Sequence, residues 1–596
     1  MTKTNTRNFD LLYTDLSQID KDKKNIQNIT NQFISKWQNI FNTKNKSDND
    51  VSLDNILEAL IDYESLFAHP VRSKPSAYRR LQYHIHLDDD TIKAEFNKIQ
   101  EFERDIHLSL QFFELWLAKL DSQTQQKLLD KCKLTTKLEK SQKNNLPYNF
   151  LKQIFTTAKY NLSAPEEKIL TMMSKTSFKN RIQMTEEFIA NDEVDSKWFE
   201  ELMTMTRNEN KKIRTKWIKS INTLLQKYED VATHEYNSVL EHKKTIDSLR
   251  GYEYPDDSRC FHDDISREVV HNMIDVVSDN FHLSQRWYKI KAKLLWQKTI
   301  TYGERSASIG KINQKFDFDK GKNIIKQTFS KIDNEFASIL DIFLSQWRID
   351  VFPTKGKSWW AFNVWFAKNL PNFVMLNWTD SFSDITTFAH EMGHAIHSTL
   401  SSQNQNALQC DYSMSLAETA STFCEDFAWD EVVQTLSPEE KLIAYAQKLD
   451  DTIATIFRQV ACYKFELEIH KQYRQSNHLS KQDIGQIFIA NMQNYMWDTV
   501  DFTDATNQRV YRSHIRRFFY VYSYASGLLV SFSLQQKFKN SPDFIHDIKS
   551  KFLSMGSSKT PVDIFASMWL DISKKGFREN GLKKVEELLE KVEELM

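Results

Sequence analysis

The sequence predicts a mostly helical protein with one small β-sheet. It has 11 glycines and 10 prolines among 596 residues, whereas average usage of the two would be about 12% of a chain. Sandwiches, propellers and α/β barrels need many tight turns, which these residues supply. Apolar residues recur at helical spacing along most of the chain, and only residues 359–378 alternate as strands do. The content of 40% hydrophobic and 13% aromatic residues excludes a globally disordered chain.

Charge and cysteine content exclude several classes of protein. Lysine and arginine number 79 against 80 acidic residues, so neither a basic nucleic-acid surface nor an acidic tail is expected. The five cysteines are scattered without a C-x-x-C pair, which favours a reducing compartment over a disulfide framework. The chain starts without an apolar signal segment, and its most apolar stretch, 527–534, is too short to span a bilayer. We therefore expect a soluble, cytoplasmic protein without nucleic-acid or membrane partners; the oligomeric state is not predicted.

The first half of the chain predicts amphipathic helices. Residues 53–63 and 112–120 carry apolar side chains at helical spacing. A Lys/Gln/Asn-rich stretch at 131–149 predicts a boundary between lobes, and a capping box at 163–166 restarts the helices. Helix then continues to about residue 300, with an interruption at 250–255.

The predicted sheet has two halves separated by Pro371. Phe362, Val364 and Phe366 alternate in the first half, and Phe373–Trp378 form the second. Helices follow almost to the end, and the last one, with its apolar positions from 582 to 596, is expected to pack on its own protein. The charged and aromatic stretch 355–360 receives no role.

An H-E-x-x-H motif is the strongest chemical signal. His390 and His394 are four residues apart, so a helix places both imidazoles on one face, where they can bind one zinc ion. Glu391 would lean toward the open coordination position and take a proton from water there. The alternative is a surface helix with incidental histidines. Phe388 and Ile396 instead predict a largely buried helix, and buried histidines beside a glutamate need a reason.

A third histidine follows in the same helix. His397 lies seven residues after His390, about 10.5 Å along the axis. A straight helix cannot bring both to one metal, so we expect His397 to support the site or pack beside it.

The third metal ligand is expected on the next helix. A polar loop at 401–411 separates the two helices, and Glu418 and Glu425 then share a helix face. Ser415 with Glu418 also fits a capping box, so spacing leaves open whether Glu418 only caps the helix.

These motifs together resemble a known family. The segment 390–397 (HEMGHAIH) followed by 418–425 (ETASTFCE) is similar to the thimet-oligopeptidase-like (M3) family of zinc metallopeptidases, in particular its oligoendopeptidase F branch. The resemblance extends over nearly the whole chain, with further similar stretches at 9–16, 249–255, 374–379 and 519–527.

The resemblance implies one zinc ion per chain. By matching position, His390, His394 and Glu418 become the ligands and Glu391 the catalytic base. Glu425 becomes the carboxylate that orients a ligating histidine.

The family also uses a downstream histidine and tyrosines to hold substrate and stabilise the oxyanion. The matching positions favour His514 and Tyr524. On a straight helix Tyr520 shares a face with Tyr524 while Tyr522 points the opposite way, and both are kept as alternatives. Many relatives have proline where this chain has Ser513, a departure that puts the role of His514 in question.

For the whole chain, the resemblance implies a large helical zincin-type metallopeptidase, with a small β-sheet beside the active-site helix and a channel between helical lobes. Residues 1–130 would form the N-terminal lobe, 131–200 a connecting segment of the oligoendopeptidase F N-terminal type, and 201–596 the M3-like catalytic domain. The expected function is hydrolysis of internal bonds in short unstructured peptides. The peptide is expected to add an antiparallel strand to the sheet edge at 373–378.

Two other functions stay open: a zinc peptidase acting from the C-terminus, like a dipeptidyl carboxypeptidase, and a non-catalytic peptide-binding protein on the same scaffold. Two other histidine patterns, at 84–86 and 233–238, lack ligand partners at suitable spacing and are not expected to bind metal.

Overall fold

The structure, a computed structural model, describes residues 7–41, 51–138, 146–512 and 514–596. The chain packs into two units, each made of three segments. Unit 1 comprises Met1–Pro165, Lys315–Val432 and Leu534–Leu570, and unit 2 comprises Glu166–Gln314, Val433–Ser533 and Asp571–Met596.

The predicted division at residues 130 and 200 is not tested by these units, because each of them draws on the range 201–596. It stays a prediction. The boundary predicted within 131–149 lies partly at 139–145, outside the described residues.

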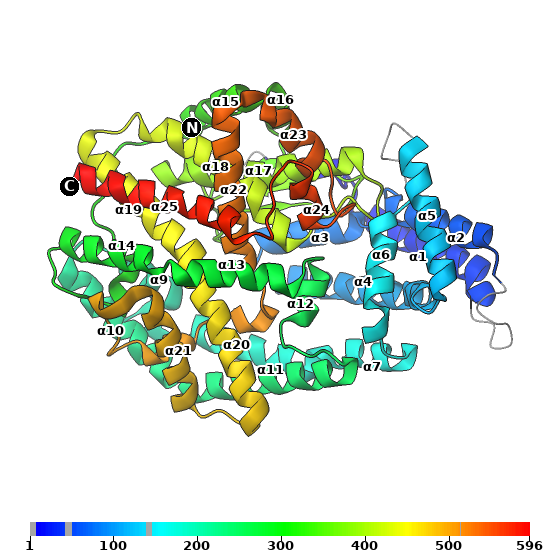
Figure 1. The fold of residues 1–596 in the computed structure, drawn as a ribbon, viewed down its shortest axis with the longest axis horizontal. Coiled ribbons are helices and arrows are strands. Elements are labelled where there is room, and N and C mark those ends of the chain that lie inside the picture. Colours follow the sequence, from blue (N-terminus) through cyan, green and yellow to red (C-terminus); the bar gives the residue numbers. More distant parts are fainter. Residues whose placement is uncertain (1–6, 42–50, 139–145, 513) are drawn as a thin grey trace. The chain divides into compact units, whose positions relative to one another are not determined.

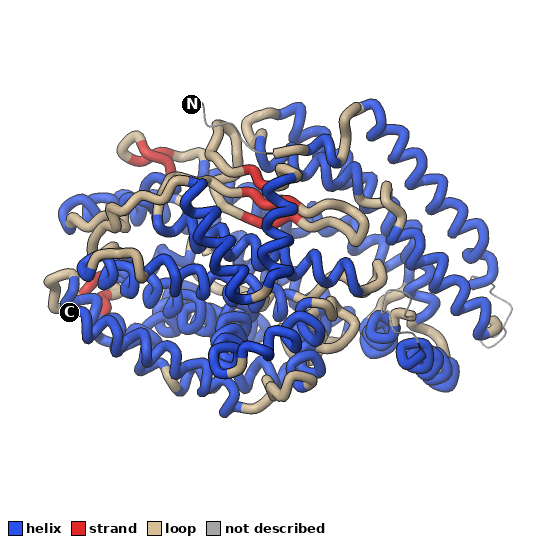
Figure 2. Tube along the Cα trace, turned by 90° about the horizontal axis from the view of Figure 1, so that it is seen from above, coloured by secondary structure: helices blue, strands red, loops and turns tan. Residues whose placement is uncertain are grey.

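Helices dominate both units, and the strands are short and few (Figures 1 and 2). This confirms the predicted fold class. The helices of unit 1 are α1 (Ser17–Phe41), α2 (Leu53–Ala68), α3 (Lys74–Ile85), α4 (Asp90–Leu117), α5 (Ser122–Leu138), α6 (Tyr148–Thr157), α15 (Phe318–Ile332), α16 (Asn334–Ser345), α17 (Phe382–Asn404), α18 (Met414–Val433), α23 (Ile545–Asp547) and α24 (Pro561–Ala566).

Unit 2 holds the remaining helices, except that α7 begins and α22 ends in segments of unit 1, while α18 of unit 1 ends at Val433 of unit 2. They are α7 (Ala164–Ser174), α8 (Asn180–Ala190), α9 (Phe199–Met205), α10 (Lys211–Lys227), α11 (Glu229–Arg250), α12 (Asp257–His262), α13 (Arg267–Asp279), α14 (Phe281–Leu294), α19 (Pro438–Ile453), α20 (Gln459–Ser476), α21 (Lys481–Met496), α22 (Tyr522–Asn540) and α25 (Lys575–Leu595).

The helix boundaries follow local sequence signals. The hydroxyl of Ser52 accepts a hydrogen bond from the Asn55 N–H at the start of α2, and Ser437 caps α19 ahead of Pro438. The interruption predicted at 250–255 is real, because α11 ends at Arg250 and is followed by Gly251, whose φ of 76° suits glycine. Aromatic packing then holds helices together, as where Phe33 of α1 meets Phe113 of α4 at 5.5 Å between ring centroids.

The sheet beside α17 has three strands in the order β4-β6-β5. Strand β4 (Ile349–Asp350) runs parallel to β6 (Phe373–Met375), and β5 (Phe362–Val364) runs antiparallel to it. The two predicted halves are confirmed as β5 and β6. The two-residue strand β4 was missed, because so short a segment shows no alternation.

The expectation that the second half offers a free sheet edge is wrong. Strand β6 is central, with β4 paired on one side and β5 on the other. Its backbone hydrogen-bonding groups are therefore engaged on both sides, and the edges of the sheet belong to β4 and β5.

A buried ion pair ties this sheet together and explains the charged stretch at 355–360. The Lys357 ammonium contacts Asp350 at 3.1 Å and donates to the carbonyls of Phe352 at 2.9 Å and Leu376 at 2.5 Å. Arg7 binds the other carboxylate oxygen of Asp350 at 2.7 Å. Lys357 thus links the segment after β4 to the end of β6, which is a structural role.

The connection between α17 and α18 is shorter than predicted. Helix α17 continues to Asn404, so the loop predicted at 401–411 begins only at Gln405. The polar residues there are buried: Gln405 donates to the Ser554 carbonyl at 2.7 Å, and Asn406 donates to Gln409 at 3.0 Å. Partners from elsewhere in the unit satisfy these groups, so polar composition did not mark an exposed loop.

Two small two-stranded ladders lie in unit 2. Strands β1 (Glu193–Val194) and β2 (Lys197–Trp198) are antiparallel, while β3 (Ile300–Thr301) and β7 (Val500–Asp501) are parallel.

All five cysteines lie within the described residues, are buried, and form no disulfide. No helix of the described part of the chain combines the length and the apolar character needed to cross a membrane.

Candidate active site

Helix α17 positions the H-E-x-x-H motif. Its first turn is fixed by Asp384, whose carboxylate accepts from the backbone N–H groups of Ser381 at 2.8 Å and Thr379 at 2.7 Å. An acidic side chain there satisfies amides that the helix leaves unpaired and suits the positive end of its dipole. The helix therefore begins at a defined residue, two turns before the motif.

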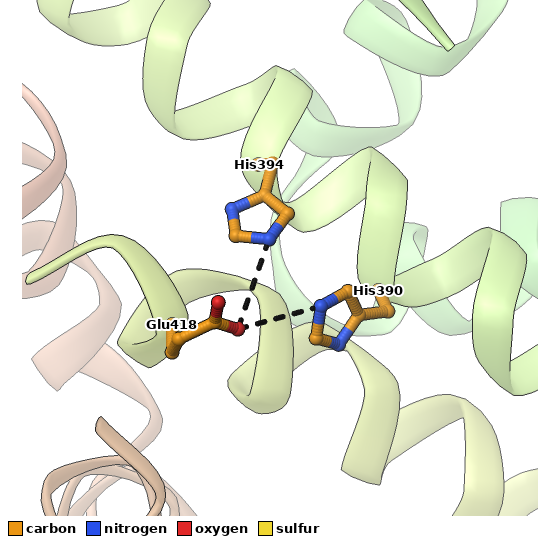
Figure 3. A group of neighbouring side chains, drawn as sticks. All are labelled: His390, His394 and Glu418. Carbon is orange, nitrogen blue, oxygen red and sulfur yellow. Dashed lines mark ion pairs between the residues drawn. The ribbon is translucent and has the colours of Figure 1, made fainter. Parts of the chain in front are cut away.

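The two histidines and Glu418 converge (Figure 3). One carboxylate oxygen of Glu418 lies 3.5 Å from His390 Nε2 and 3.9 Å from His394 Nε2. Within the described residues these three form the group whose ligand atoms lie close enough to hold a metal ion, all within 4.8 Å of one another. The histidines are not fully buried as predicted, since their side chains are 23% and 18% exposed. Partial exposure suits side chains that must be reached by a ligand.

Close packing of α17 on α18 brings Glu418 to the histidines. Gly393 lies against the backbone of α18, where a Cβ atom would meet the Cα of Ser421 at 2.6 Å and the carbonyl oxygen of Ala420 at 2.7 Å. Real Cβ atoms do not approach other atoms so closely. The glycine of the motif is therefore what allows the two helices to come this close.

The capping-box alternative for Glu418 is wrong. Helix α18 begins at Met414, and the Ser413 carbonyl already accepts from the Ala417 N–H at 3.1 Å. Ser415 lies inside the first turn and its hydroxyl contacts that of Ser413 at 2.7 Å. Glu418 is thus an interior helix residue that is free to face the histidines.

Glu425 holds His390, as expected of it. Its carboxylate lies 2.9 Å from His390 Nδ1, which leaves Nε2 directed toward Glu418. Burial would lower the pKa of His390, but the hydrogen bond to Glu425 and the nearby carboxylate charges raise it to about 9. Burial lowers the pKa of His394, which lacks such a partner, to about 4. The site therefore favours a protonated ring at His390 and a neutral ring at His394.

Glu391 is buried, next in sequence to His390, and contacts the backbone of Asn363 in strand β5. Burial raises its pKa to about 7, and a hydrogen bond from the Asn363 backbone acts in the opposite direction. Its second oxygen, Oε2, has no hydrogen-bond partner within the described residues. One oxygen is thus fixed while the other is left to interact with a ligand. This backbone contact had no side-chain signal in the sequence.

His397 packs away from the cluster. It is fully buried and stacks on Tyr412 with ring centroids 3.7 Å apart, and Phe552 contacts it from another side. It is not part of the ligand group, which agrees with the argument from helix rise. Of the two roles left open for it, the geometry favours packing.

The other predicted site residues lie in unit 2. His514 begins a 3₁₀ turn (514–517), and α22 starts only at Tyr522. Between them Phe518 and Phe519 have positive φ values of 43° and 56°, so the helix assumed for this stretch is broken. Ser513 lies outside the described residues.

With the helix broken here, Tyr520 lies close to His514 and Tyr524, whereas Tyr522 has a different partner. Tyr520 lies 6.2 Å from His514 and 5.8 Å from Tyr524 between ring centroids. Tyr522 is instead buried, and its hydroxyl donates to Asp263 at 2.7 Å. The geometry groups Tyr520 and Tyr524 with His514 and gives Tyr522 a structural partner.

Buried polar groups hold this strained segment. Arg259 donates to the Phe518 carbonyl at 3.1 Å, and the carboxyl group of Glu466 accepts from the Phe519 N–H at 3.0 Å. Glu466 is fully buried and its Oε2 has no partner within the described residues. Burial raises the pKa of Glu466 to about 8. Positive φ values at two phenylalanines are unfavourable, so such anchors are needed.

The two dismissed histidine patterns form no metal group among the described residues. His84, at the end of α3, contacts Ser358 at 3.0 Å through Nδ1, and residues 233–238 lie within α11.

Comparison with known proteins decides the family. The sequence profile described as "Peptidase family M3" matches residues 204–583, which is more than half of the chain. The chain belongs to peptidase family M3. This M3 peptidase is 26% identical over 399 residues to an oligoendopeptidase F homolog of Borreliella burgdorferi, covering 65% of this chain and 67% of that protein.

Two further comparisons extend over most of this M3 peptidase. An oligoendopeptidase F homolog of Lactococcus lactis subsp. lactis is 22% identical over 535 residues, covering 85% of this chain and 86% of that one. The crystal structure of oligoendopeptidase-F from Enterococcus faecium superposes with a TM-score of 0.70 at 15% identity, over 97% of this chain and 99% of that one. At that identity the structure supports the fold.

The predicted family, its oligoendopeptidase F branch and the enzyme class of metallopeptidase are thereby confirmed. The roles of individual residues and the identity of the metal stay predictions.

Proposed function

We propose that this M3 peptidase is a zinc-dependent oligoendopeptidase that hydrolyses internal bonds of short, unstructured peptides. The observation that carries the proposal is the convergence of His390, His394 and Glu418 beside the buried Glu391. A cytoplasmic location belongs to the same proposal, and the five cysteines without a disulfide support it.

The donor set fits one zinc ion. Two imidazole nitrogens and one carboxylate oxygen are the ligands of many catalytic zinc sites, which keep a fourth position open. Ligand atoms around a tetrahedral zinc at about 2.0–2.1 Å lie about 3.3–3.4 Å apart, close to the 3.5 and 3.9 Å between Glu418 and the two histidines. When bound, zinc supplies a Lewis acid that lowers the pKa of water and polarises the scissile carbonyl.

Glu391 is the proposed proton carrier. The oxygen that has no partner accepts a proton from the attacking water, while the Asn363 N–H helps to hold the carboxyl group in place. The same carboxyl group then delivers the proton to the leaving amine nitrogen. A protein that only bound peptides would not need a base at this position.

His514 and Tyr524 are proposed to donate hydrogen bonds to the carbonyl oxygen as negative charge develops on it. The support is the family resemblance, together with the grouping of both residues around Tyr520. Burial lowers the pKa of His514 to about 3, so the ring is neutral at pH 7 and would donate through N–H. Tyr520 remains the alternative donor.

The substrate is proposed to pair with the edge strand β5 rather than with β6. Within the described part of the chain, strand β5 is paired only with β6, and Asn363 in it also contacts Glu391. A peptide that adds to this edge must be extended with its backbone groups unpaired. Folded proteins do not present such a segment without local unfolding, which suppresses their binding.

A peptide-length series tests this function. End-blocked and unblocked peptides of increasing length are incubated with the enzyme, with a chelator, and with the chelator followed by Zn²⁺, and products are identified by mass spectrometry. We expect internal cleavage of short peptides irrespective of blocking, loss of activity with chelator, and recovery with zinc. Release of dipeptides only from free C-termini would indicate the carboxypeptidase mode. Binding without cleavage in the zinc-loaded protein would indicate the non-catalytic scaffold.

A further inference from the structure

Four arginines surround a small cavity in unit 2, in residues that the peptidase chemistry does not use. The cavity has a volume of about 130 Å³. Its lining includes Arg207 after α9, Arg305 before α15, Arg458 between α19 and α20, and Arg512 before α22. Segments far apart in the sequence thus bring four positive charges to one place.

No carboxylate lines this cavity among the described residues. The acidic groups close by are already paired: Glu304 binds Arg214 at 2.9 Å, and Asp450 binds Lys291 at 2.5 Å. Guanidinium groups within a protein are normally matched by carboxylates or other anions. Among the residues that the structure describes, no carboxylate in the cavity lining balances the four arginines.

The guanidinium groups also retain unused donors. Arg305 donates to the Tyr302 carbonyl at 2.8 Å and to the Tyr511 hydroxyl at 2.9 Å, and Arg512 donates to the Tyr302 hydroxyl at 3.1 Å. Arg305 and Arg512 are only 8% and 9% exposed. Nevertheless, the buried Nε atoms of Arg305, Arg458 and Arg512 have no hydrogen-bond partner among the described residues. Buried donors of this kind ordinarily find an acceptor.

The backbone around the cavity is specialised. A Cβ atom at Gly303 would lie 2.6 Å from Ile218, so only glycine lets the turn that carries Arg305 approach α10 this closely. Arg458 ends a π-helical turn (454–458) between α19 and α20. Such turns are rare and often occur at functional sites.

We propose that this cavity binds one tetrahedral oxyanion, such as inorganic phosphate or sulfate. The cavity volume of about 130 Å³ leaves room for an anion of five heavy atoms. Four guanidinium groups supply converging donors, which is the arrangement proteins use for such anions.

Tyr511 is the other group that could carry negative charge here. Burial would raise its pKa, but the charges of Arg512, Arg305 and Arg458 bring it below the usual value for tyrosine. A phenolate would fill the role assigned to the bound anion. Its ionisation therefore has to be measured alongside anion binding.

The test is calorimetric titration of the full-length, zinc-loaded protein with sodium sulfate at constant ionic strength, with chloride as the replaced anion. We expect saturable binding of one sulfate per chain. Arg458→Gln and the exposed rim variant Arg207→Gln should each weaken binding at least tenfold. Arg181→Gln, at an exposed arginine of α8 outside the cavity, should leave it unchanged.

Thermal unfolding gives a second readout. The difference in unfolding temperature between the parent and Arg458→Gln should change sign when sulfate is added. In sulfate-free buffer Arg458→Gln should unfold at the same temperature as the parent or above it, because it removes one of four like charges. In saturating sulfate the parent should be the more stable, by linkage to binding. General stabilisation by sulfate instead rises without saturation and equally in all variants.

Three results would overturn the proposal. The first is the absence of saturable binding, and the second is equal affinity in the parent and Arg207→Gln, the variant least able to disturb folding. The third is a tyrosinate absorbance at pH 7 that disappears in Tyr511→Phe. None of these measurements depends on peptidase activity, so the proposal stands or falls separately from the proposed function.

Discussion

Replacing Gly393 by alanine should damage the metal site through the backbone, without touching a ligand. A Cβ atom there would lie 2.6 Å from the Ser421 Cα, and ordinary contact requires about 3.4 Å. Helix α18 would have to retreat by about 0.8 Å, the difference between these distances. Glu418 is less than one turn from Ser421 on the same helix, so it would move with the contact.

The size of the effect follows from the tolerance of metal sites. Distances between metal and ligand vary by only about 0.2 Å around their preferred values. A shift of about 0.8 Å would therefore move the Glu418 carboxylate out of ligand distance. We expect zinc affinity to fall at least tenfold, comparable with other losses of supporting contacts. Overpacking costs about 1–3 kcal/mol, offset by about 0.4–1 kcal/mol because alanine restricts the unfolded chain. The metal-free protein should therefore be destabilised by about 1–2 kcal/mol.

Zinc competition with a chelating dye measures the affinity, and unfolding in excess chelator measures the stability of the metal-free protein. The matched control is Gly576→Ala near the start of α25, where the nearest atom to a new Cβ is the flexible Glu579 carboxylate at 4.0 Å. That variant should keep its zinc affinity and be as stable as the parent or slightly more so. Parent-like zinc affinity in Gly393→Ala would refute the packing argument.

Three further predictions concern single side chains. Glu391→Gln should keep its zinc and lose most turnover, whereas His394→Ala should lose the metal, as metal analysis and peptide cleavage would show. Glu418→Ala should lose zinc, while Ser415→Ala keeps full occupancy, because α18 begins before Ser415. The stability of Glu466→Gln relative to the parent should increase as pH rises from about 5 to 8, as thermal unfolding would show. The Glu466 carboxyl stays protonated to about pH 8 in the folded protein but ionises near 4.3 when unfolded, so parent stability falls by about 1.4 kcal/mol per pH unit between these values.

Each of these has a result that contradicts it. A Gln variant at 391 that loses zinc as His394→Ala does would mean that this glutamate is needed to hold the metal. Full zinc occupancy in Glu418→Ala would remove it from the ligand set. A difference in stability between Glu466→Gln and the parent that does not change with pH would show that the carboxyl group ionises normally in the folded state. The total effect of that group is at most about 5 kcal/mol, from its pKa of about 8.

The sequence predicted the metal group because helical spacing leaves little freedom. A spacing of four residues from His390 to His394 places both rings on one face, and the rise of the helix excludes His397. Glu418 was harder, since spacing could not separate a ligand from a helix cap. The hydrogen bond from the Ala417 N–H to the Ser413 carbonyl shows that the helix begins before Ser415. The sequence alone does not indicate which of the two serines precedes the helix.

The segment from His514 to Tyr524 could not be predicted in the same way. Sequence patterns assign positive φ to glycine or asparagine, yet here Phe518 and Phe519 adopt it. Their conformation depends on Arg259 and Glu466, which are distant in the sequence. Tyr520 precedes α22, which begins at Tyr522, so the helical period does not account for its position. Its ring nevertheless lies 5.8 Å from that of Tyr524 between centroids.

The role of strand β5 shows why backbone groups escape sequence reasoning. Alternation predicted that Phe362 and Val364 form a strand, but the choice of neighbour depends on β4, a strand of two residues with no pattern of its own. Once β4 occupies one side of β6, the substrate edge proposed for this peptidase must move to β5. The Asn363 N–H beside Glu391 then comes from that same strand. Every residue type carries such an N–H except proline, so its position becomes visible only when the sheet order is known.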